Sequence, residues 1–195
     1  MNFGRLICAA AALCLFGARQ AAGAAEAPSW LDRSPPAAWN KPAAAIPRRA
    51  PGPVENGARC ASNVRRATSL EDQRIAAAGW RLVGAYLRFD GTSIVEAASG
   101  FDGMCRWAGY NAFVFVDGTY AGTLSPTPMD SRSDGALIDV HLYSAGAISG
   151  TFSRYTPDDP LCCPTRTSSA TYSLQGKGKL TVVTASGVST SANPK

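Results

Sequence analysis

The stretch from Asn111 to Asp134 constrains the fold more than any other part of the sequence. It opens with a dense apolar run, Phe113-Val-Phe-Val116, whose aromatic and β-branched residues are typical of strands. Asp117-Gly118 follows, and Asp-Gly between two such runs is a strong signal for a tight hairpin turn. We therefore predict a β-hairpin with its return strand over Thr119–Leu124 and take this hairpin as the folding centre.

The remaining patterns predict an α+β fold that is mainly an antiparallel sheet of short strands and hairpins, with one N-terminal helix and stapling disulfides. Thr68-Ser-Leu-Glu71 has the capping-box pattern and predicts a helix over Ser69–Ala78, which Gly79 ends. Runs with strand periodicity, separated by turn residues, predict the other strands. These runs are Trp80–Phe89, Ser93–Ala98, Ala136–Tyr143, Ala147–Tyr155, Thr171–Gln175 and Lys179–Thr184.

The ends of the chain do not have the composition of a globular domain. Leu6 to Ala18 is apolar and has the length of a signal-peptide core, but it is shorter than the roughly 20 residues that span a membrane. We predict a signal peptide over residues 1–24, a Pro/Ala-rich spacer over 25–58, a single domain over 59–185 and a disordered tail over 186–195. Trp30 and Trp39 in the spacer either dock on a folded surface or belong to an unstructured leader.

Signal cleavage would leave four cysteines, Cys60, Cys105, Cys162 and Cys163. An even number of cysteines in an exported protein predicts two disulfides. Cys162 and Cys163 are adjacent, and side chains of neighbours in an extended segment point in opposite directions. We therefore expect each of them to pair with Cys60 or Cys105, in one of two arrangements that the sequence leaves open.

Charge excludes one class of partner. The formal net charge is +5 at pH 7, but basic and acidic residues are equal in number between Cys60 and Ala185. Nucleic-acid binding needs a clustered basic footprint, so we expect no nucleic-acid partner. No phosphate loop, hydrolase carboxylate pair or nucleophile elbow occurs in the sequence, and we predict no cofactor and no catalytic residue.

The polar cluster Met129-Asp-Ser-Arg-Ser-Asp134 follows the central hairpin and is the best candidate for a binding site. In one interpretation Arg132 binds an anion through its forked guanidinium. In the other, Asp130 and Asp134 neutralise Arg132 and cap the turns of the loop. The predicted binding residues are Met129, Asp130, Ser131, Arg132 and Asp134 in this cluster, joined by Arg154 and Asp159 if the disulfides fold that segment back.

His141 is the only histidine. Alternation in its strand assigns Ala136, Ile138, Val140 and Leu142 to the core and places His141 on the opposite face, beside Asp139. We interpret it as a half-exposed structural histidine. A zinc site would need His141 with three cysteines, and adjacent Cys162 and Cys163 lack the usual two-residue spacing, so we predict no metal site.

Three segments resemble the LppP/LprE lipoprotein family. They are Phe113–Pro126 with its Phe-Val-Phe-Val-Asp-Gly start, Pro128–Gly135, and Asp159-Pro-Leu-Cys-Cys-Pro164, within a resemblance that extends from Trp80 to Leu174. The resemblance implies an exported cell-envelope protein without an established activity and transfers no catalytic residue.

Lipid anchoring is not expected, because Cys8 follows Ile7 and Cys14 follows Leu13, neither of which is the small residue that precedes a lipidated cysteine.

These observations lead to one functional expectation and two alternatives. We expect an exported protein, periplasmic or extracellular, without a transmembrane segment after signal cleavage. It would be a non-enzymatic domain that binds an unidentified envelope ligand or protein. The alternatives are a secreted enzyme built around His141 and a purely structural envelope protein.

Overall fold

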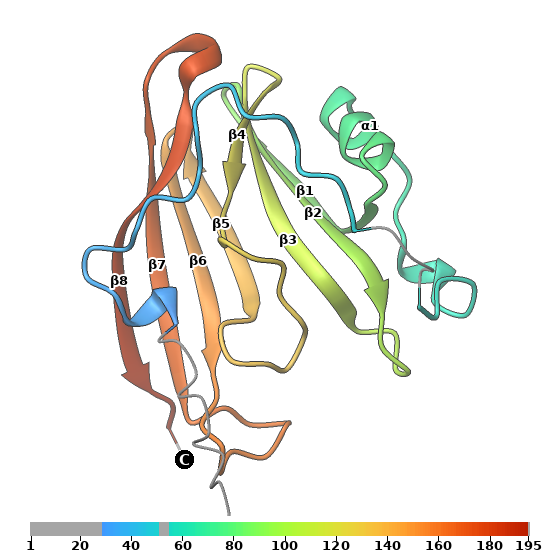
Figure 1. The fold of residues 1–195 in the computed structure, drawn as a ribbon, viewed down its shortest axis with the longest axis vertical. Helices are drawn as coiled ribbons and strands as arrows, with labels where there is room; N and C mark the ends of the chain where they lie inside the picture. Colours follow the sequence, from blue (N-terminus) through green and yellow to red (C-terminus); the bar gives the residue numbers. More distant parts are fainter. Residues whose placement is uncertain (1–28, 51–54, 195) are drawn as a thin grey trace, which may run out of the picture.

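The computed structural model describes residues 29–50 and 55–194, so the predicted signal peptide lies outside the described residues. Eight strands form two four-stranded sheets, β1-β2-β3-β4 and β5-β6-β7-β8, and every pairing within them is antiparallel (Figure 1). The strands are β1 (Arg81–Phe89), β2 (Thr92–Phe101), β3 (Trp107–Val116), β4 (Thr119–Thr123), β5 (Leu137–Ser144), β6 (Ala147–Arg154), β7 (Arg166–Gln175) and β8 (Val182–Ala192). The helical elements are α1 (Leu70–Ala77) and three short 3-10 turns, η1 (Trp30–Asp32), η2 (Ala61–Asn63) and η3 (Gly178–Leu180). Within the described residues, the predicted dominance of antiparallel sheet and the predicted α-helix are confirmed.

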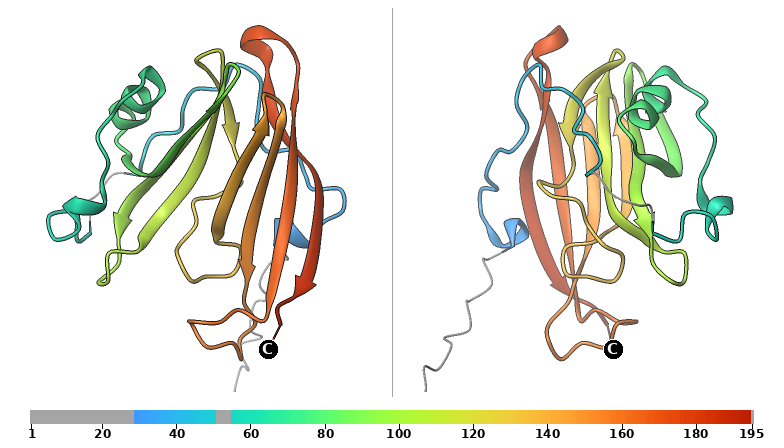
Figure 2. Two further views of the ribbon diagram at one scale, coloured as in Figure 1. Left: turned by 180° about the vertical axis from the view of Figure 1, so that it is seen from behind. Right: turned by 45° about the vertical axis from the view of Figure 1, so that its right-hand side comes forward.

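The two sheets face each other and bury the main hydrophobic core between them, as Figure 2 shows from two sides. Their edges approach on both flanks, where β1 lies beside β5 and β4 lies beside β8. Side chains of both sheets fill the core, among them Val83, Ile94, Tyr110, Val114, Ile148, Phe152 and Tyr172.

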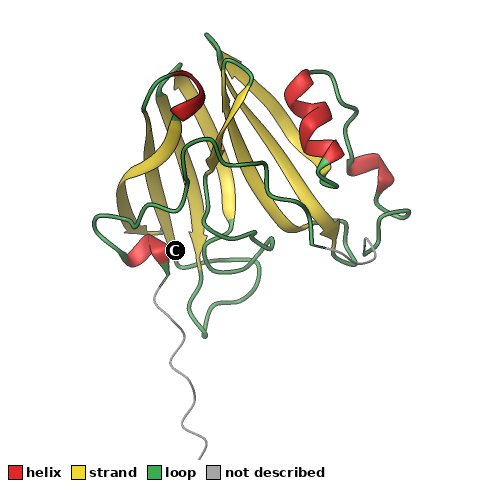
Figure 3. Ribbon diagram, turned by 45° about the horizontal axis from the view of Figure 1, so that its top comes forward, coloured by secondary structure: helices red, strands yellow, loops and turns green. Residues whose placement is uncertain are grey.

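A second apolar cluster covers the outer face of the first sheet, where α1 packs (Figure 3). Phe113 and Phe115 belong to this cluster, whereas Val114 between them points into the main core. All three side chains are fully buried. Burial of β3 on both faces explains why its sequence is a continuous apolar run rather than an alternating one.

Two Asp-Gly turns shape the first sheet as predicted. Asp117 and Gly118 have φ values of 48° and 71°, and Asp90 and Gly91 have φ values of 39° and 81°. Positive φ at both central residues matches the twist of a two-residue hairpin. The predicted hairpins β3–β4 and β1–β2 are therefore confirmed.

The predicted helix is confirmed, but its cap lies one residue later. Ser69 is the N-cap, and its hydroxyl accepts a hydrogen bond from the Asp72 N–H at 3.1 Å. The Asp72 carboxylate accepts one from the Thr68 N–H at 2.9 Å and two from Arg65, each at 2.7 Å. Ser69 therefore caps the helix, and the Asp72 carboxylate bonds back to the preceding residue, Thr68, and to Arg65.

β5 departs from the predicted alternation at one point. Its ladder with β6 shifts by a residue between Leu137 and Asp139, which is a β-bulge. Leu137 is therefore buried and Ile138 is 60% exposed, the reverse of the predicted assignment. After the bulge the alternation resumes, so that Val140 is buried and His141 exposed.

The structure corrects the predicted disulfide pairing. Cys60 bonds to Cys105, and Cys162 bonds to Cys163, so neither of the two adjacent cysteines reaches a distant partner. The segment around Cys162 is a turn rather than an extended strand, closed by a bond of 2.9 Å from the Cys163 N–H to the carbonyl of Pro160. The staple between Cys60 and Cys105 joins η2 to the loop between β2 and β3.

Two segments at the ends of the described chain are ordered parts of the fold. β8 continues to Ala192, where the sequence predicted a disordered tail from residue 186. The described part of the predicted spacer, residues 29–50, runs along the sandwich from the second sheet to the first (Figure 1). Leu31 is buried in the main core, and Trp30 and Trp39 pack against it.

Asn40 fastens this N-terminal segment to the edges of both sheets. Its Nδ2 donates to the carbonyls of Thr123 and Val183, both at 2.9 Å, and its Oδ1 accepts from the Thr123 N–H at 2.9 Å. Gly122 leaves room for this side chain, because a Cβ there would lie 2.2 Å from the Asn40 Cγ. Asn40 therefore closes the flank between β4 and β8.

Replacing Asn40 with alanine is expected to lower the free energy of unfolding by about 2 kcal/mol. The substitution removes the bonds to the Val183 carbonyl and the Thr123 N–H, whereas the Thr123 carbonyl keeps the bond from the Trp39 indole N–H. Chemical denaturation would measure the change. Lys41→Ala is the matched control, since the neighbouring lysine is exposed. Equal stability of the two variants would contradict the role given to Asn40.

Candidate functional site

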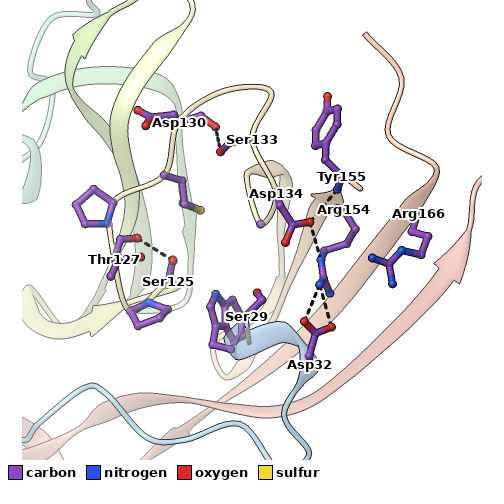
Figure 4. A pocket seen from close by; sticks show the side chains of 15 residues that line it. Ser29, Asp32, Ser125, Thr127, Asp130, Ser133, Asp134, Arg154, Tyr155 and Arg166 are labelled. Carbon is purple, nitrogen blue, oxygen red and sulfur yellow. Dashed lines mark hydrogen bonds and ion pairs between the residues drawn. The ribbon is translucent and has the colours of Figure 1, made fainter. Parts of the chain in front are cut away.

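A cavity of about 680 Å³ lies where the N-terminal turn, the loop between the two sheets and the paired ends of β6 and β7 meet (Figure 4). Each of these chain segments supplies one wall. The lining residues are Ser29, Trp30, Asp32, Ser125, Pro126, Thr127, Pro128, Met129, Asp130, Ser133, Asp134, Gly135, Arg154, Tyr155 and Arg166.

The loop wall of the cavity is anchored to β3. Tyr110 and Met129 exchange backbone hydrogen bonds of 2.8 Å in both directions. The Asn111 side chain donates to the Ser125 carbonyl at 3.0 Å and accepts from the Ser125 N–H at 3.3 Å. The loop is therefore held in place although it has no regular secondary structure.

Arg154 ties the three walls together. The residue is 2% exposed, and its guanidinium donates from Nη2 to both carboxylate oxygens of Asp32 at 2.9 Å, and from Nε to Asp134 at 3.0 Å. Nη1 donates to the Ser168 hydroxyl at 3.1 Å. Burial alone would lower the pKa of Arg154, but the bonds to Asp32 and Asp134 outweigh it and raise the pKa.

Arg166 is the second cation of the cavity. It is the direct cross-strand partner of Arg154 in the β6–β7 ladder. Its Nε is buried without a hydrogen-bond partner, and within the described part of the chain no acceptor contacts its guanidinium. Every guanidinium nitrogen of Arg154 has a hydrogen-bond partner in the protein, whereas the guanidinium of Arg166 can still bind a ligand.

The structure brings together four of the seven residues predicted to bind. Met129, Asp130, Asp134 and Arg154 line the cavity. Asp134 and Arg154 form an ion pair with each other, and Asp130 accepts a hydrogen bond from the Gly109 N–H at 2.7 Å.

Ser131, Arg132 and Asp159 do not line the cavity. The Ser131 hydroxyl donates to the Trp107 carbonyl at 2.9 Å. Arg132 is exposed and has no ion pair with any described residue, so its neutralisation by Asp130 and Asp134 is not observed. The two carboxylates instead accept backbone hydrogen bonds from Gly109 and Tyr155.

Asp159 organises its own loop rather than the cavity. Its carboxylate accepts from the backbone N–H groups of Thr165 and Thr156 at 3.0 and 2.9 Å. These bonds lower the pKa of Asp159 to about 2, with the Thr165 N–H the larger cause.

The sequence interpretation missed Arg166 and the N-terminal wall with Asp32. Arg166 has no local signal, since only the ladder register places it beside Arg154. Asp32 is 122 positions away from Arg154 in sequence. The apolar residues Trp30 and Leu31 in a polar, Pro-rich segment were the one available hint that this segment docks.

His141 lies elsewhere, on the exposed face of β5. Its Nε2 is 2.9 Å from an Asp139 carboxylate oxygen, and its ring stacks on Tyr143 with centroids 5.5 Å apart. Ser149 is its cross-strand partner, but among the described residues no hydrogen bond joins their side chains. The half-exposed position predicted for His141 is observed.

Across the described ranges, 29–50 and 55–194, no three His, Cys, Asp or Glu side chains are arranged to hold a metal ion. None of the helices in these ranges has the length and apolar character needed to cross a membrane.

Comparison with known proteins gives one family. Residues 92–177 match the family described as LppP/LprE lipoprotein. A search of curated proteins and a search of solved structures give no match. The matched region contains the loop wall and both arginines of the cavity, whereas Ser29, Trp30 and Asp32 lie outside it. The match confirms the family that the sequence suggested, and residues 92–177 are an LppP/LprE lipoprotein region.

Proposed function

We propose that this protein is a non-enzymatic binding domain, exported to the cell envelope, and that its ligand occupies the cavity between the N-terminal turn and the two sheets. The family supports an exported protein of unknown activity. The observation that carries the binding role is the cavity itself, about 680 Å³ in volume, which lies within the usual range of small-molecule sites.

Hydrogen bonds within the protein join the walls of the cavity. Arg154 fixes the N-terminal turn through Asp32 and the loop through Asp134, and Asn111 holds the loop at Ser125. A preorganised site does not spend binding free energy on ordering its walls. This arrangement favours a binding site over an incidental gap between loops.

The lining suits a small polar ligand. Trp30, Pro126 and Pro128 offer flat apolar surface, and the Thr127 hydroxyl and the second carboxylate oxygen of Asp130 have no partner among the described residues. Apolar faces with a few placed polar groups are the usual composition of such sites.

An enzyme built around His141 has less support. Asp139 and His141 form a pair on an exposed strand surface, and neither lines the large cavity. Nucleophilic catalysis requires the nucleophile within hydrogen-bond reach of its base, and the nearest cross-strand hydroxyl, that of Ser149, makes no such bond within the described chain. The geometry therefore supports binding better than catalysis.

Filling the cavity should abolish binding. We expect Thr127→Trp to remove the chemical-shift changes that glucose, glucuronate or glucose 6-phosphate produces in the ¹H–¹⁵N NMR spectrum of the wild type. Those changes should centre on residues 125–135 and on the ends of β6 and β7. Ser169→Trp is the matched control, because it adds the same side chain at an exposed position of β7.

Equal binding by the wild type and Thr127→Trp would contradict this site. So would ligand-induced changes centred on His141. A cavity that takes none of the three probes would favour the purely structural alternative.

A further inference from the structure

We propose that the ligand carries an anionic group, a carboxylate or a phosphate, and that Arg166 binds it. The inference rests on the proposed function, because it names the class of ligand that the same cavity would take. It moves the anion-binding role from Arg132, on the exposed loop, to an arginine of the sheet.

Two arginines sit side by side at one end of the cavity. Arg154 and Arg166 are paired across β6 and β7, and both line the cavity. Two like charges in this position repel each other unless anions compensate them. A compensating anion is therefore expected near each guanidinium.

Only one of the two forms ion pairs among the described residues. Arg154 directs its Nε, Nη1 and Nη2 to Asp134, Ser168 and Asp32. Asp32 accepts bonds from Arg154, Asp134 accepts bonds from Arg154 and from the Tyr155 N–H, and neither carboxylate bonds to Arg166. Figure 4 shows Arg166 beside this network with no dashed line to it.

The Arg166 guanidinium has the properties of an anion receptor. Its planar fork of donors matches the two oxygens of a carboxylate or phosphate. Its Nε is shielded from solvent without an acceptor, and a shielded donor without an acceptor destabilises the fold. A ligand in the cavity would bond to the outer nitrogens of the fork, which have no acceptor among the described residues, rather than to the shielded Nε.

The opposite wall of the cavity determines which polar groups the rest of the ligand can carry. Asp130, on the loop, is exposed and keeps one carboxylate oxygen without a described partner. It would repel a second anion and accept a hydrogen bond from a hydroxyl or an amine. The cavity thus selects a ligand with an anionic group at one end and a hydrogen-bond donor at the other.

Three probes with the same sugar ring test the inference. Glucose is neutral, glucuronate carries a carboxylate and glucose 6-phosphate carries a phosphate. We expect the wild type to bind at least one of the two charged sugars ten times or more tighter than glucose by NMR titration. The tighter of the two identifies the anionic group.

Substitution of Arg166 should remove this preference. We expect Arg166→Gln to reduce the ratio between charged and neutral sugar to less than threefold, and Arg166→Lys to keep part of it, because lysine retains the charge without the fork. Arg132→Gln is the matched control and should leave the ratio unchanged. Denaturation curves establish that each variant is folded.

The outcomes separate this inference from the proposed function. An Arg166→Gln variant that keeps the preference for charged sugars overturns the inference, and so does a wild type that binds glucose as tightly as both charged sugars. Charged sugars that bind equally to Thr127→Trp, but not to Arg166→Gln, would confirm Arg166 and refute the cavity.

Discussion

Replacing Arg154 with methionine is expected to lower the free energy of unfolding by about 3 kcal/mol, near the lower end for loss of one member of a buried ion pair. The variant leaves Asp32 and Asp134 as two neighbouring carboxylates without their cation. Both keep contact with water, since their side chains are 44% and 37% exposed, and this contact limits the loss.

The matched control for this prediction is Arg132→Met, on the exposed loop. Both variants exchange an arginine for a methionine, but only Arg154 is buried and fully bonded. We expect Arg132→Met to change the free energy of unfolding by less than about 0.5 kcal/mol. Chemical denaturation of both variants measures the difference, and a stable Arg154→Met would show that the three walls hold together without it.

Glu96 is expected to make stability depend on pH near neutrality. It lies on the face of β2 that carries Ile94 and Ala98 of the main core. Its carboxylate occupies space that Gly84 leaves free, because a Cβ on Gly84 would lie 2.2 Å from the Glu96 Oε2. The β-bulge in β1 between Val83 and Tyr86 creates this space.

The surroundings of Glu96 favour its neutral form. Loss of hydration is the largest effect and raises its pKa from 4.5 to about 7. The Ala85 N–H and Arg65 lower the pKa, and the charge of Asp139 raises it. The protonated carboxyl is therefore the form that the folded protein prefers.

A carboxyl whose folded pKa is raised stabilises the fold below its unfolded pKa and loses this contribution as pH rises through the folded pKa. For Glu96 the window runs from 4.5 to about 7. One unit of pKa corresponds to about 1.4 kcal/mol, so the full loss is at most about 3 kcal/mol.

Glu96→Gln should remove this loss. We expect the variant to equal the wild type at pH 4 and to exceed its free energy of unfolding by up to about 3 kcal/mol at pH 9. Asp158→Asn serves as the control, because Asp158 is exposed. If the Glu96→Gln and wild-type stabilities differ by the same amount at both pH values, Glu96 is not the titrating group.

Local chemistry explains which parts of the fold the sequence predicts well. The turns at Asp90-Gly91 and Asp117-Gly118 need residues that accept positive φ, and the Asp-Gly pairs that indicate this can be read from the sequence. The helix is equally local, since its cap lies within four residues of its first turn. Each of these elements depends on neighbours in sequence.

The wrong or missing predictions concern segments whose structure depends on residues far away in the sequence. The tail that forms β8 is polar because one face of the second sheet meets solvent, so its Ser/Thr residues resemble an unstructured segment, although Val188 packs against the core. The loop that carries the predicted binding cluster lines the cavity, and Arg154 pairs with Asp32 and Asp134. Arg166 could be identified only from the register of β6 and β7, which places it opposite Arg154.

The bonds of Asn40 have a consequence for the order in which the chain folds. They join residues 83 and 143 positions apart. Synthesis delivers the N-terminal residues first, whereas the Val183 carbonyl is made only when β8 begins. The Asn40 anchor is therefore complete only once residues of both sheets are present, and contacts of such long range predict slow folding.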